Sequence, residues 1–221
     1  MSKQFWIALV VIAAILVGIV VVTNHNNGST SSSTGKPTQH VEGKDSKNVT
    51  LIEYGDYECP ICNEFYPSVK QVVADEFNNI KFQFSNLPLT QIHPNAFAGA
   101  RAAEAASDLG QFWQMHDLLY ENQNAWVSSS NPLSFFDNYA SSLGLNVAQF
   151  NTDYSSNQVD NAINADLNAF NQTGDQMATP TFILDGKTLN NVNLIGSNNI
   201  PSVTAFEKII NAEIAKKNPT T

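Results

Sequence analysis

The sequence predicts an α/β domain in which a block of helices interrupts a single sheet. Three observations lead to this prediction: a strand–helix–strand pattern at residues 48–89, consecutive helical patterns across about residues 92–175, and a strand–strand–helix pattern after them. A strand, a helix and a strand that follow closely along the chain typically form one βαβ unit with parallel strands. We therefore expect both ends of the domain to contribute strands to one sheet, with the helices inserted between them.

The βαβ unit is predicted from apolar patterning. Residues 48–55 are mostly apolar before a Gly-Asp break, which is typical of a strand. Residues 59–78 repeat apolar side chains at helical spacing, and the stripe consists of Phe65, Val69, Val72 and Phe77. Residues 80–89 begin with apolar side chains that alternate with polar ones, so this segment is predicted to be the second strand.

The central block contains four helical patterns. Pro94 is expected at the start of an alanine-rich helix over residues 96–106, and Gly110 is expected to end it. The other three helices are predicted from apolar side chains at helical spacing over residues 111–121, 133–143 and 156–171.

Strands return after the block. Residues 181–184 are predicted to be a strand, Asp185-Gly186 a hairpin turn, and residues 187–194 the partner strand. A final helix is expected to begin near Pro201 and to bury Val203, Phe206, Ile210 and Ile214.

The first 22 residues predict a membrane anchor. Residues 5–22 form an apolar run without charge, and as a helix they would be ~27 Å long, close to the ~30 Å hydrocarbon core of a bilayer. Lys3 precedes the run, which favours a cytoplasmic N-terminus and an extracytoplasmic domain in a single-pass protein of the cell membrane. The alternative is a cleaved signal peptide, although its apolar region is usually shorter and ends in small residues.

Residues 23–47 predict a flexible tether. They are rich in Ser, Thr, Asn and Gly and show no apolar periodicity, so we expect a coil in which His25 and His40 are solvated. The folded domain is then expected to span residues 48–221. The chain carries a net charge of −9, which disfavours nucleic acid as a partner because phosphates are repelled.

Both cysteines of the chain lie in the motif Cys59-Pro60-Ile61-Cys62, between a predicted strand and a predicted helix. Cys59 falls at the helix N-cap, where free backbone N–H groups and the helix dipole favour a thiolate. Cys62 lies one turn into the helix, and Pro60 stiffens the first turn. This arrangement is typical of thiol–disulfide exchange.

A structural disulfide, a zinc site and a covalent haem each fit the two cysteines less well. A structural disulfide over such a short loop stabilises a protein little. A structural zinc site needs four ligands, and no second cysteine pair exists. Covalent haem would require histidine after the second cysteine, where the chain has Asn63. We therefore expect no metal site, and we expect His93 and His116 to be capping or packing residues.

The chain resembles the DsbA-like branch of the thioredoxin-fold thiol:disulfide oxidoreductases, in particular its membrane-anchored or secreted subgroup. The resemblance covers most of residues 48–217. Its carriers are VTLIEYGDYE at 49–58 leading into CPIC, HPNA at 93–96, FWQMHD at 112–117 and ATPTF at 178–182. It implies an α/β thioredoxin fold with a helical insertion between its βαβ and ββα halves.

The resemblance also implies roles for single residues. Cys59 would be the nucleophile and Cys62 the resolving thiol of a redox-active disulfide. Pro180 would be cis and face that disulfide, and the Thr179 backbone would bind a substrate strand by β-augmentation. Pro60 and Ile61, between the cysteines, would contact the same substrate.

A further carboxyl group and one substitution affect the expected chemistry. By resemblance, Glu53 would lie beneath the site and move the proton of Cys62, a role that burial favours by raising its pKa. Strongly oxidising members carry histidine where this chain has Ile61, and four acids, Glu53, Asp56, Glu58 and Glu64, surround the motif. We therefore expect a milder oxidant than the strongest members, with a less depressed Cys59 pKa.

The sequence thus predicts an extracytoplasmic thiol:disulfide oxidoreductase. It would oxidise the cysteines of exported polypeptides, and its redox group would be the cysteine pair without another cofactor. A quinone-coupled membrane oxidase is the expected partner for reoxidation. The alternatives are a reductase or isomerase with the same site, or a non-catalytic anchored chaperone or copper carrier that would use both cysteines with Met177.

Overall fold

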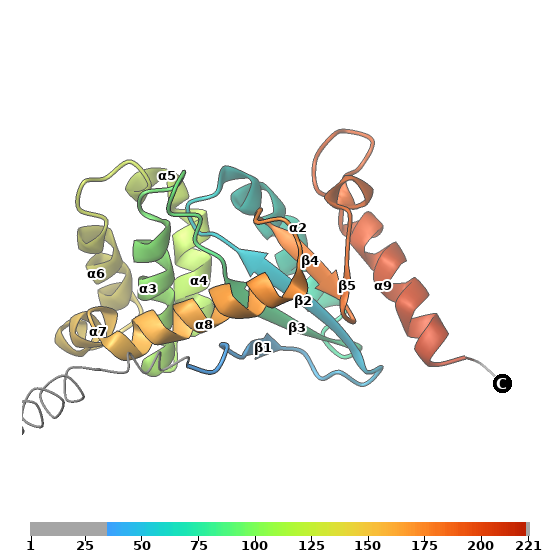
Figure 1. Cartoon of the computed structure of the whole chain (residues 1–221), viewed down its shortest axis with the longest axis horizontal. Coiled ribbons are helices and arrows are strands. Elements are labelled where there is room, and N and C mark those ends of the chain that lie inside the picture. The colour runs from blue at the N-terminus through green and yellow to red at the C-terminus, as the bar shows by residue number, and fades with distance from the viewer. Residues whose placement is uncertain (1–34, 220–221) are drawn as a thin grey trace, which may run out of the picture. The chain divides into compact units, whose positions relative to one another are not determined.

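A five-stranded mixed sheet organises the part of the chain that the structure describes (Figure 1). The computed structural model describes residues 35–219. The sheet order is β1-β3-β2-β4-β5, in which β2 and β3 run parallel and the other neighbours antiparallel. The strands are β1 His40–Glu42, β2 Val49–Gly55, β3 Ile80–Asn86, β4 Thr181–Leu184 and β5 Lys187–Thr188.

The helices confirm the predicted insertion. Helix α2 (Pro60–Asp75) connects β2 to β3, and six helices follow between β3 and β4. These six are α3 Ala96–Asp108, α4 Phe112–Glu121, α5 Gln123–Trp126, α6 Leu133–Ser142, α7 Val147–Tyr154 and α8 Asn157–Thr173. After β5 come the 3-10 helix η1 (Asn191–Leu194) and α9 (Val203–Lys217). The thioredoxin fold with a helical insertion is therefore present.

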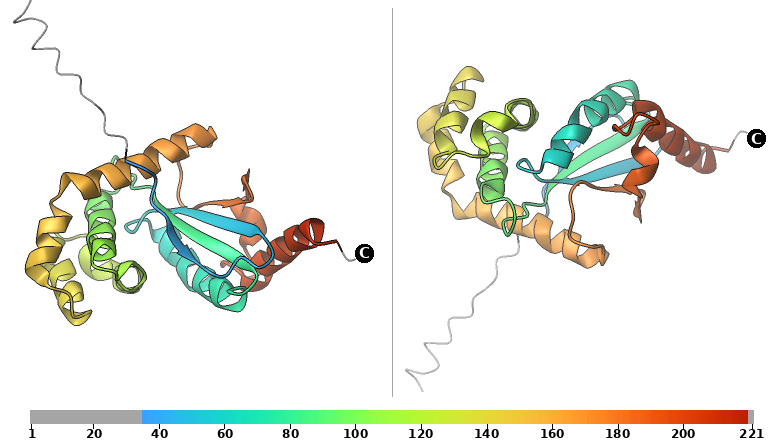
Figure 2. Two further views of the ribbon diagram at one scale, coloured as in Figure 1. Left: turned by 90° about the horizontal axis from the view of Figure 1, so that it is seen from below. Right: turned by 90° about the horizontal axis from the view of Figure 1, so that it is seen from above.

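The sheet is covered on both faces (Figure 2). Helix α2 lies across one face, where Phe65 contacts Phe182 of β4 and Phe206 of α9. Helix α8 covers the opposite face, where Phe170 meets Tyr54 of β2 edge to face. Side chains alternate between the faces along each strand. The central strand β2 is thus buried on both sides, and it ends at Gly55, shortly before the cysteine motif.

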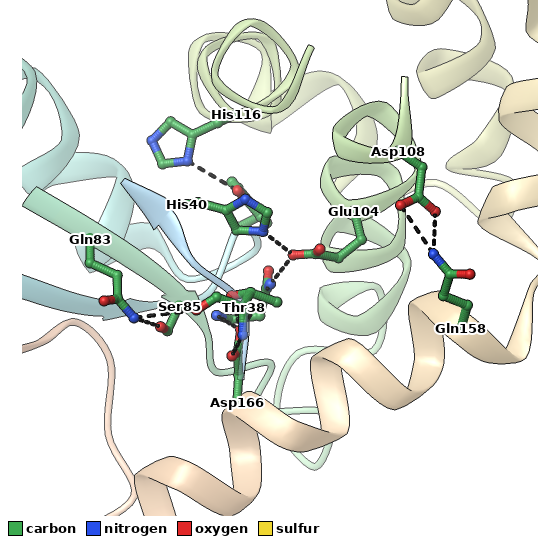
Figure 3. A network of polar contacts seen from close by, with 11 residues as sticks. Thr38, His40, Gln83, Ser85, Glu104, Asp108, His116, Gln158 and Asp166 are labelled. Atoms are coloured by element: carbon green, nitrogen blue, oxygen red, sulfur yellow. Dashed lines mark hydrogen bonds and ion pairs between the residues drawn. The ribbon is translucent and has the colours of Figure 1, made fainter. Parts of the chain in front are cut away.

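A buried polar network ties β1 to the helical insertion (Figure 3). Thr38 donates its backbone N–H and its hydroxyl to Asp166 of α8, both at 2.7 Å. His40 lies 2.7 Å from Glu104 of α3, and Asn86 of β3 donates to both carboxylates. The prediction that His40 is solvated is therefore wrong, because β1 pairs with β3 and holds this ring inside the network.

Three local predictions are also wrong. Helix α2 ends at Asp75, so Phe77 falls outside it and is 41% exposed, with the Lys44 ammonium over its ring. Pro94 precedes α3, whose N-cap is Asn95. The strand expected over residues 187–194 stops at Thr188, because the Asn190 side chain accepts from the N–H of Val192 and starts η1.

The predicted membrane helix over residues 5–22 lies outside the described residues, as does the predicted tether up to residue 34. Within residues 35–219, no helix combines the length and the apolar character needed to cross a bilayer.

Candidate active site

Cys59 is the N-cap residue of α2, as expected. Its backbone is extended, with φ −66° and ψ 121°, and Pro60 occupies the first helical position. The Cys59 side chain lies 3.5 Å from the carbonyl oxygen of Thr179. Both cysteines are free thiols; Cys59 is 5% exposed and Cys62 is fully buried. Cys59 is therefore the thiol that a substrate can reach.

The two thiols differ in acidity. A hydrogen bond from the Cys62 thiol, supported by the backbone N–H groups of Ile61 and Cys62, lowers the pKa of Cys59 to about 6. Burial raises the pKa of Cys62 well above its usual value. Cys59 is thus mostly a thiolate at neutral pH, whereas Cys62 keeps its proton. This is the distribution that thiol–disulfide exchange through Cys59 requires.

Glu53 lies in the middle of β2, beneath the motif. It pairs with Phe84 of β3 on one side and with Phe182 of β4 on the other, and it is 3% exposed. Burial, with a smaller contribution from the Cys59 thiolate, raises the pKa of Glu53 to about 8. A carboxyl group with this pKa can both donate and accept a proton near neutrality.

A small cavity connects Glu53 to the surface. Its volume is about 40 Å³, which is room for one or two water molecules. Tyr120 lines it and has a buried hydroxyl without a hydrogen-bond partner among the described residues. Lys70 and Asp117, an exposed ion pair, line it as well. The cavity offers the carboxyl group a short route to solvent.

The Thr179–Pro180 peptide bond is cis, as expected. The Thr179 carbonyl lies against the motif, next to the Cys59 side chain. Asn191 holds this loop, because its side-chain amide donates to the Pro180 carbonyl at 2.7 Å. Around it the surface is apolar. Ile61 is 46% exposed, and Met177 lines a hollow of about 480 Å³ together with Pro88, Leu89, Thr90, Gln91, Ile92 and Leu167.

Two of the four acids near the motif bind residues of the loop between β3 and α3. The Asp56 carboxylate accepts from the N–H of Leu89 and lies 2.7 Å from His93 Nδ1. The Glu58 carboxylate accepts from the N–H of Asn95. Their charges are therefore engaged in fixing the loop before α3, and His93 is a polar partner of Asp56.

Two further residues hold the loop that leads into the motif. His116 hydrogen-bonds the Tyr57 hydroxyl at 3.0 Å, and burial lowers the pKa of this histidine to about 3. Gln123, which the sequence did not single out, donates its side-chain amide to the carbonyl oxygens of Tyr57 and Cys59. Its segment is a run of Asn and Gln that carries no local signal of such a role. Across residues 35–219, no group of three or more His, Cys, Asp or Glu could hold a metal ion.

Comparison with known proteins agrees with the fold described above. A family model described as thioredoxin matches residues 35–212. Among curated relatives, the Na⁺/H⁺ antiporter NhaA 1 of Salinispora arenicola is 36% identical over 171 residues, which cover 75% of this chain and 24% of the relative. The Na⁺/H⁺ antiporter NhaA 3 of Salinispora tropica is 34% identical over 148 residues, 67% of this chain and 22% of the relative. The chain thus spans about a quarter of the length of these relatives.

Solved structures share the fold. BdbD from Bacillus subtilis in its oxidised form superposes with a TM-score of 0.64 at 24% identity, over 82% of this chain and 97% of that chain. A thioredoxin-like oxidoreductase from Silicibacter pomeroyi gives a TM-score of 0.62 at 20% identity, over 86% and 99% of the two chains. The chain therefore belongs to the thioredoxin family, and its cysteine pair Cys59–Cys62 lies at the N-terminus of α2.

Proposed function

We propose that the protein oxidises the cysteines of exported polypeptides. The observation that carries this proposal is the difference in acidity between the two thiols, because a stabilised Cys59 thiolate favours the reduced enzyme. A disulfide whose reduced form is stabilised is a better oxidant.

The exchange proceeds in two displacements. A substrate thiolate attacks the Cys59 sulfur, a mixed disulfide forms, and Cys62 leaves with the electron pair of the broken S–S bond. A second substrate thiolate then attacks the substrate sulfur of the mixed disulfide, and Cys59 leaves as a thiolate. The substrate loses two electrons and gains a disulfide, and the enzyme ends as a dithiol.

Glu53 supplies the proton in the first displacement. Cys62 leaves into a buried environment that disfavours its thiolate. Glu53 is protonated below about pH 8 and transfers its proton to Cys62, and the adjoining cavity returns a proton from solvent. During reoxidation Glu53 first releases its proton to solvent through the cavity, and its carboxylate then accepts the proton from Cys62.

Substrate chains bind at the apolar surface around the motif. The Thr179 backbone offers hydrogen bonds to an extended chain, and the exposed Ile61 and Met177 side chains accept apolar residues. Pro60 limits the freedom of the loop that presents Cys59. Such contacts suit unfolded chains because they depend little on sequence.

The domain works at the outer surface of the cytoplasmic membrane. The apolar run at residues 5–22 would anchor it there, and residues 23–34 would form the tether that precedes the matched family segment. The names of the curated relatives are those of membrane antiporters, which also supports a place at a membrane. A quinone-coupled membrane oxidase would restore the disulfide.

The direction of electron flow is tested by the reduction potential of the full chain in detergent, equilibrated against glutathione. We expect a value near or above roughly −150 mV, which makes the enzyme a net donor of disulfides. A value near or below roughly −250 mV would contradict the proposal and assign a reductase. Unchanged biological activity of a Cys59→Ser, Cys62→Ser double variant would instead indicate a chaperone or another non-redox module.

A further inference from the structure

The helical insertion reaches the nucleophile through one side chain. Gln123, at the start of α5, donates its amide to the carbonyl oxygens of Tyr57 and Cys59, both at 2.9 Å. It is 5% exposed, so water does not replace these bonds. Asp56 and Glu58 also contact the insertion, but of the side chains in residues 35–219 only the Gln123 amide hydrogen-bonds the backbone of Cys59.

The Cys59 carbonyl is a sensitive place for such a bond. It also accepts the N–H of Asn63 at 3.2 Å, the first hydrogen bond of α2. The direction of this carbonyl fixes how the N-cap residue meets the helix, and therefore where the Cys59 sulfur lies relative to the N–H groups of Ile61 and Cys62. A group that holds the carbonyl from outside the helix thus controls the surroundings of the thiolate.

The chemistry of the Gln123 side chain suits this task. Its amide supplies two N–H donors without a net charge, so it satisfies two buried carbonyls and adds no charge that would compete with the thiolate. The positive end of the amide dipole is directed toward the motif. A hydrocarbon side chain of equal size would fill the same space and leave the Tyr57 carbonyl without this partner.

We propose that Gln123 is a positioning residue for thiol–disulfide exchange: by holding the Cys59 carbonyl, it keeps the Cys59 thiolate against the first turn of α2. The helical insertion therefore shapes the redox chemistry of the thioredoxin core as well as its surface. This inference holds for either direction of electron flow, because it concerns the difference between a variant and the parent chain.

The test compares Gln123→Met with the parent chain, both full-length in detergent. Methionine keeps the shape and removes both donors. We expect the equilibrium constant with glutathione to shift between about three- and tenfold toward the disulfide form, the size that one lost hydrogen bond allows. The thiolate absorbance of Cys59 should titrate at higher pH than in the parent.

Two further variants make the result decisive. Asn122→Met removes a side-chain amide at the preceding residue, where this amide donates to the Leu118 carbonyl. This control should leave the redox equilibrium unchanged. Gln123→Glu places a carboxylate against the two carbonyls, and it should approach the parent equilibrium only at low pH, where its protonated form donates again. Gln123→Glu also tests the proposal if Gln123→Met does not fold.

A parental equilibrium constant in the folded Gln123 variants would overturn the proposal. The proposal would also be overturned if the substitution lowered the melting temperatures of the oxidised and reduced forms by the same amount, because Gln123 would then have a purely structural role.

Discussion

Two carboxyl groups, Glu53 of β2 and Asp166 of α8, are almost equally buried but have different surroundings. Glu53 is 3% exposed, and no hydrogen bond to its carboxyl group comes from residues 35–219; burial raises its pKa to about 8. Asp166 is fully buried but accepts hydrogen bonds from Thr38 and Asn86, and its pKa rises only to about 6.

The comparison shows how hydrogen bonds decide the role of a buried acid. Burial disfavours both charged forms, and donors aimed at the Asp166 oxygens offset much of that cost. Asp166 is therefore mostly ionised at neutral pH, and it joins the segment before β1 to β3 and α8. Glu53 lacks such donors and titrates in the range where proton transfer is useful.

The largest effect is expected for Asp166→Ala. The substitution leaves the buried donors of Thr38 and Asn86 unpaired, so it should lower the free energy of unfolding by about 3–5 kcal/mol. Denaturant unfolding measures this. Asp160→Ala on the same helix, which breaks a partly exposed ion pair with Arg101, should cost about 1 kcal/mol or less. Equal losses of unfolding free energy in the two variants would show that the buried network stabilises the fold no more than the partly exposed ion pair does.

Glu53→Gln should change how stability depends on pH. Because the folded-state pKa of Glu53 is raised to about 8, its contribution is fully present below about pH 4.5 and is lost as the pH rises through 8. The stability of the parent relative to the variant should thus fall between about pH 4.5 and 8, by up to about 1.4 kcal/mol per pH unit. The difference between the two proteins is the quantity to compare, because the lowered pKa of Cys59 adds a rise with pH above about 6 to both curves. Denaturant unfolding in buffers of increasing pH measures it, and a difference that does not change with pH would contradict the raised pKa.

Thr38→Val should leave the Asp166 carboxylate with fewer hydrogen-bond donors and so bring its pKa closer to that of Glu53. The substitution removes the hydroxyl that donates to Asp166 at 2.7 Å and keeps the backbone bond. We expect a loss of about 1 kcal/mol and a higher Asp166 pKa. NMR titration of the carboxyl carbon measures the latter. Thr152→Val, which removes an exposed hydroxyl bond to a helix carbonyl, is the matched control. An unchanged Asp166 pKa in Thr38→Val would show that the Thr38 hydroxyl does not influence it.

The smallest effect is expected for Cys59→Ser on Glu53. The thiolate of Cys59 adds to the raised pKa of Glu53, but burial contributes more. Removing the thiolate should therefore lower the Glu53 pKa modestly and leave it above 4.5. Carboxyl-carbon NMR titration of Glu53 in both proteins measures this shift. An equal or higher Glu53 pKa in the variant would show that the two groups do not interact.

Local patterns predicted much of this molecule. The strands around Leu51 and Phe82, helix α2 after the motif and the helical insertion follow from periodicity that the neighbouring residues carry themselves. The cysteine motif, its N-cap position and the cis bond before Pro180 were also expected, the last from the resemblance. Such features depend on residues that are close in the chain.

Features that depend on distant contacts were missed. Strand β1 lies in a polar segment and is held by Asp166, 128 residues away from Thr38, so composition alone suggested a coil. Helix α5 has four residues, too few for a periodic pattern. Gln123 acts on carbonyls more than 60 residues away, and a glutamine among asparagines gives no local indication of such a contact.

The position of β1 at the edge of the sheet has a mechanical consequence. A pull on the chain N-terminal to residue 35 reaches β1 first, and β1 pairs only with β3. The load would therefore fall on the short β1–β3 ladder and on the bonds between Thr38 and Asp166. Strand β2, which precedes the redox motif, lies one strand in from that edge, between β3 and β4. Opening of the β1–β3 ladder would therefore leave β2 paired with both of its neighbours.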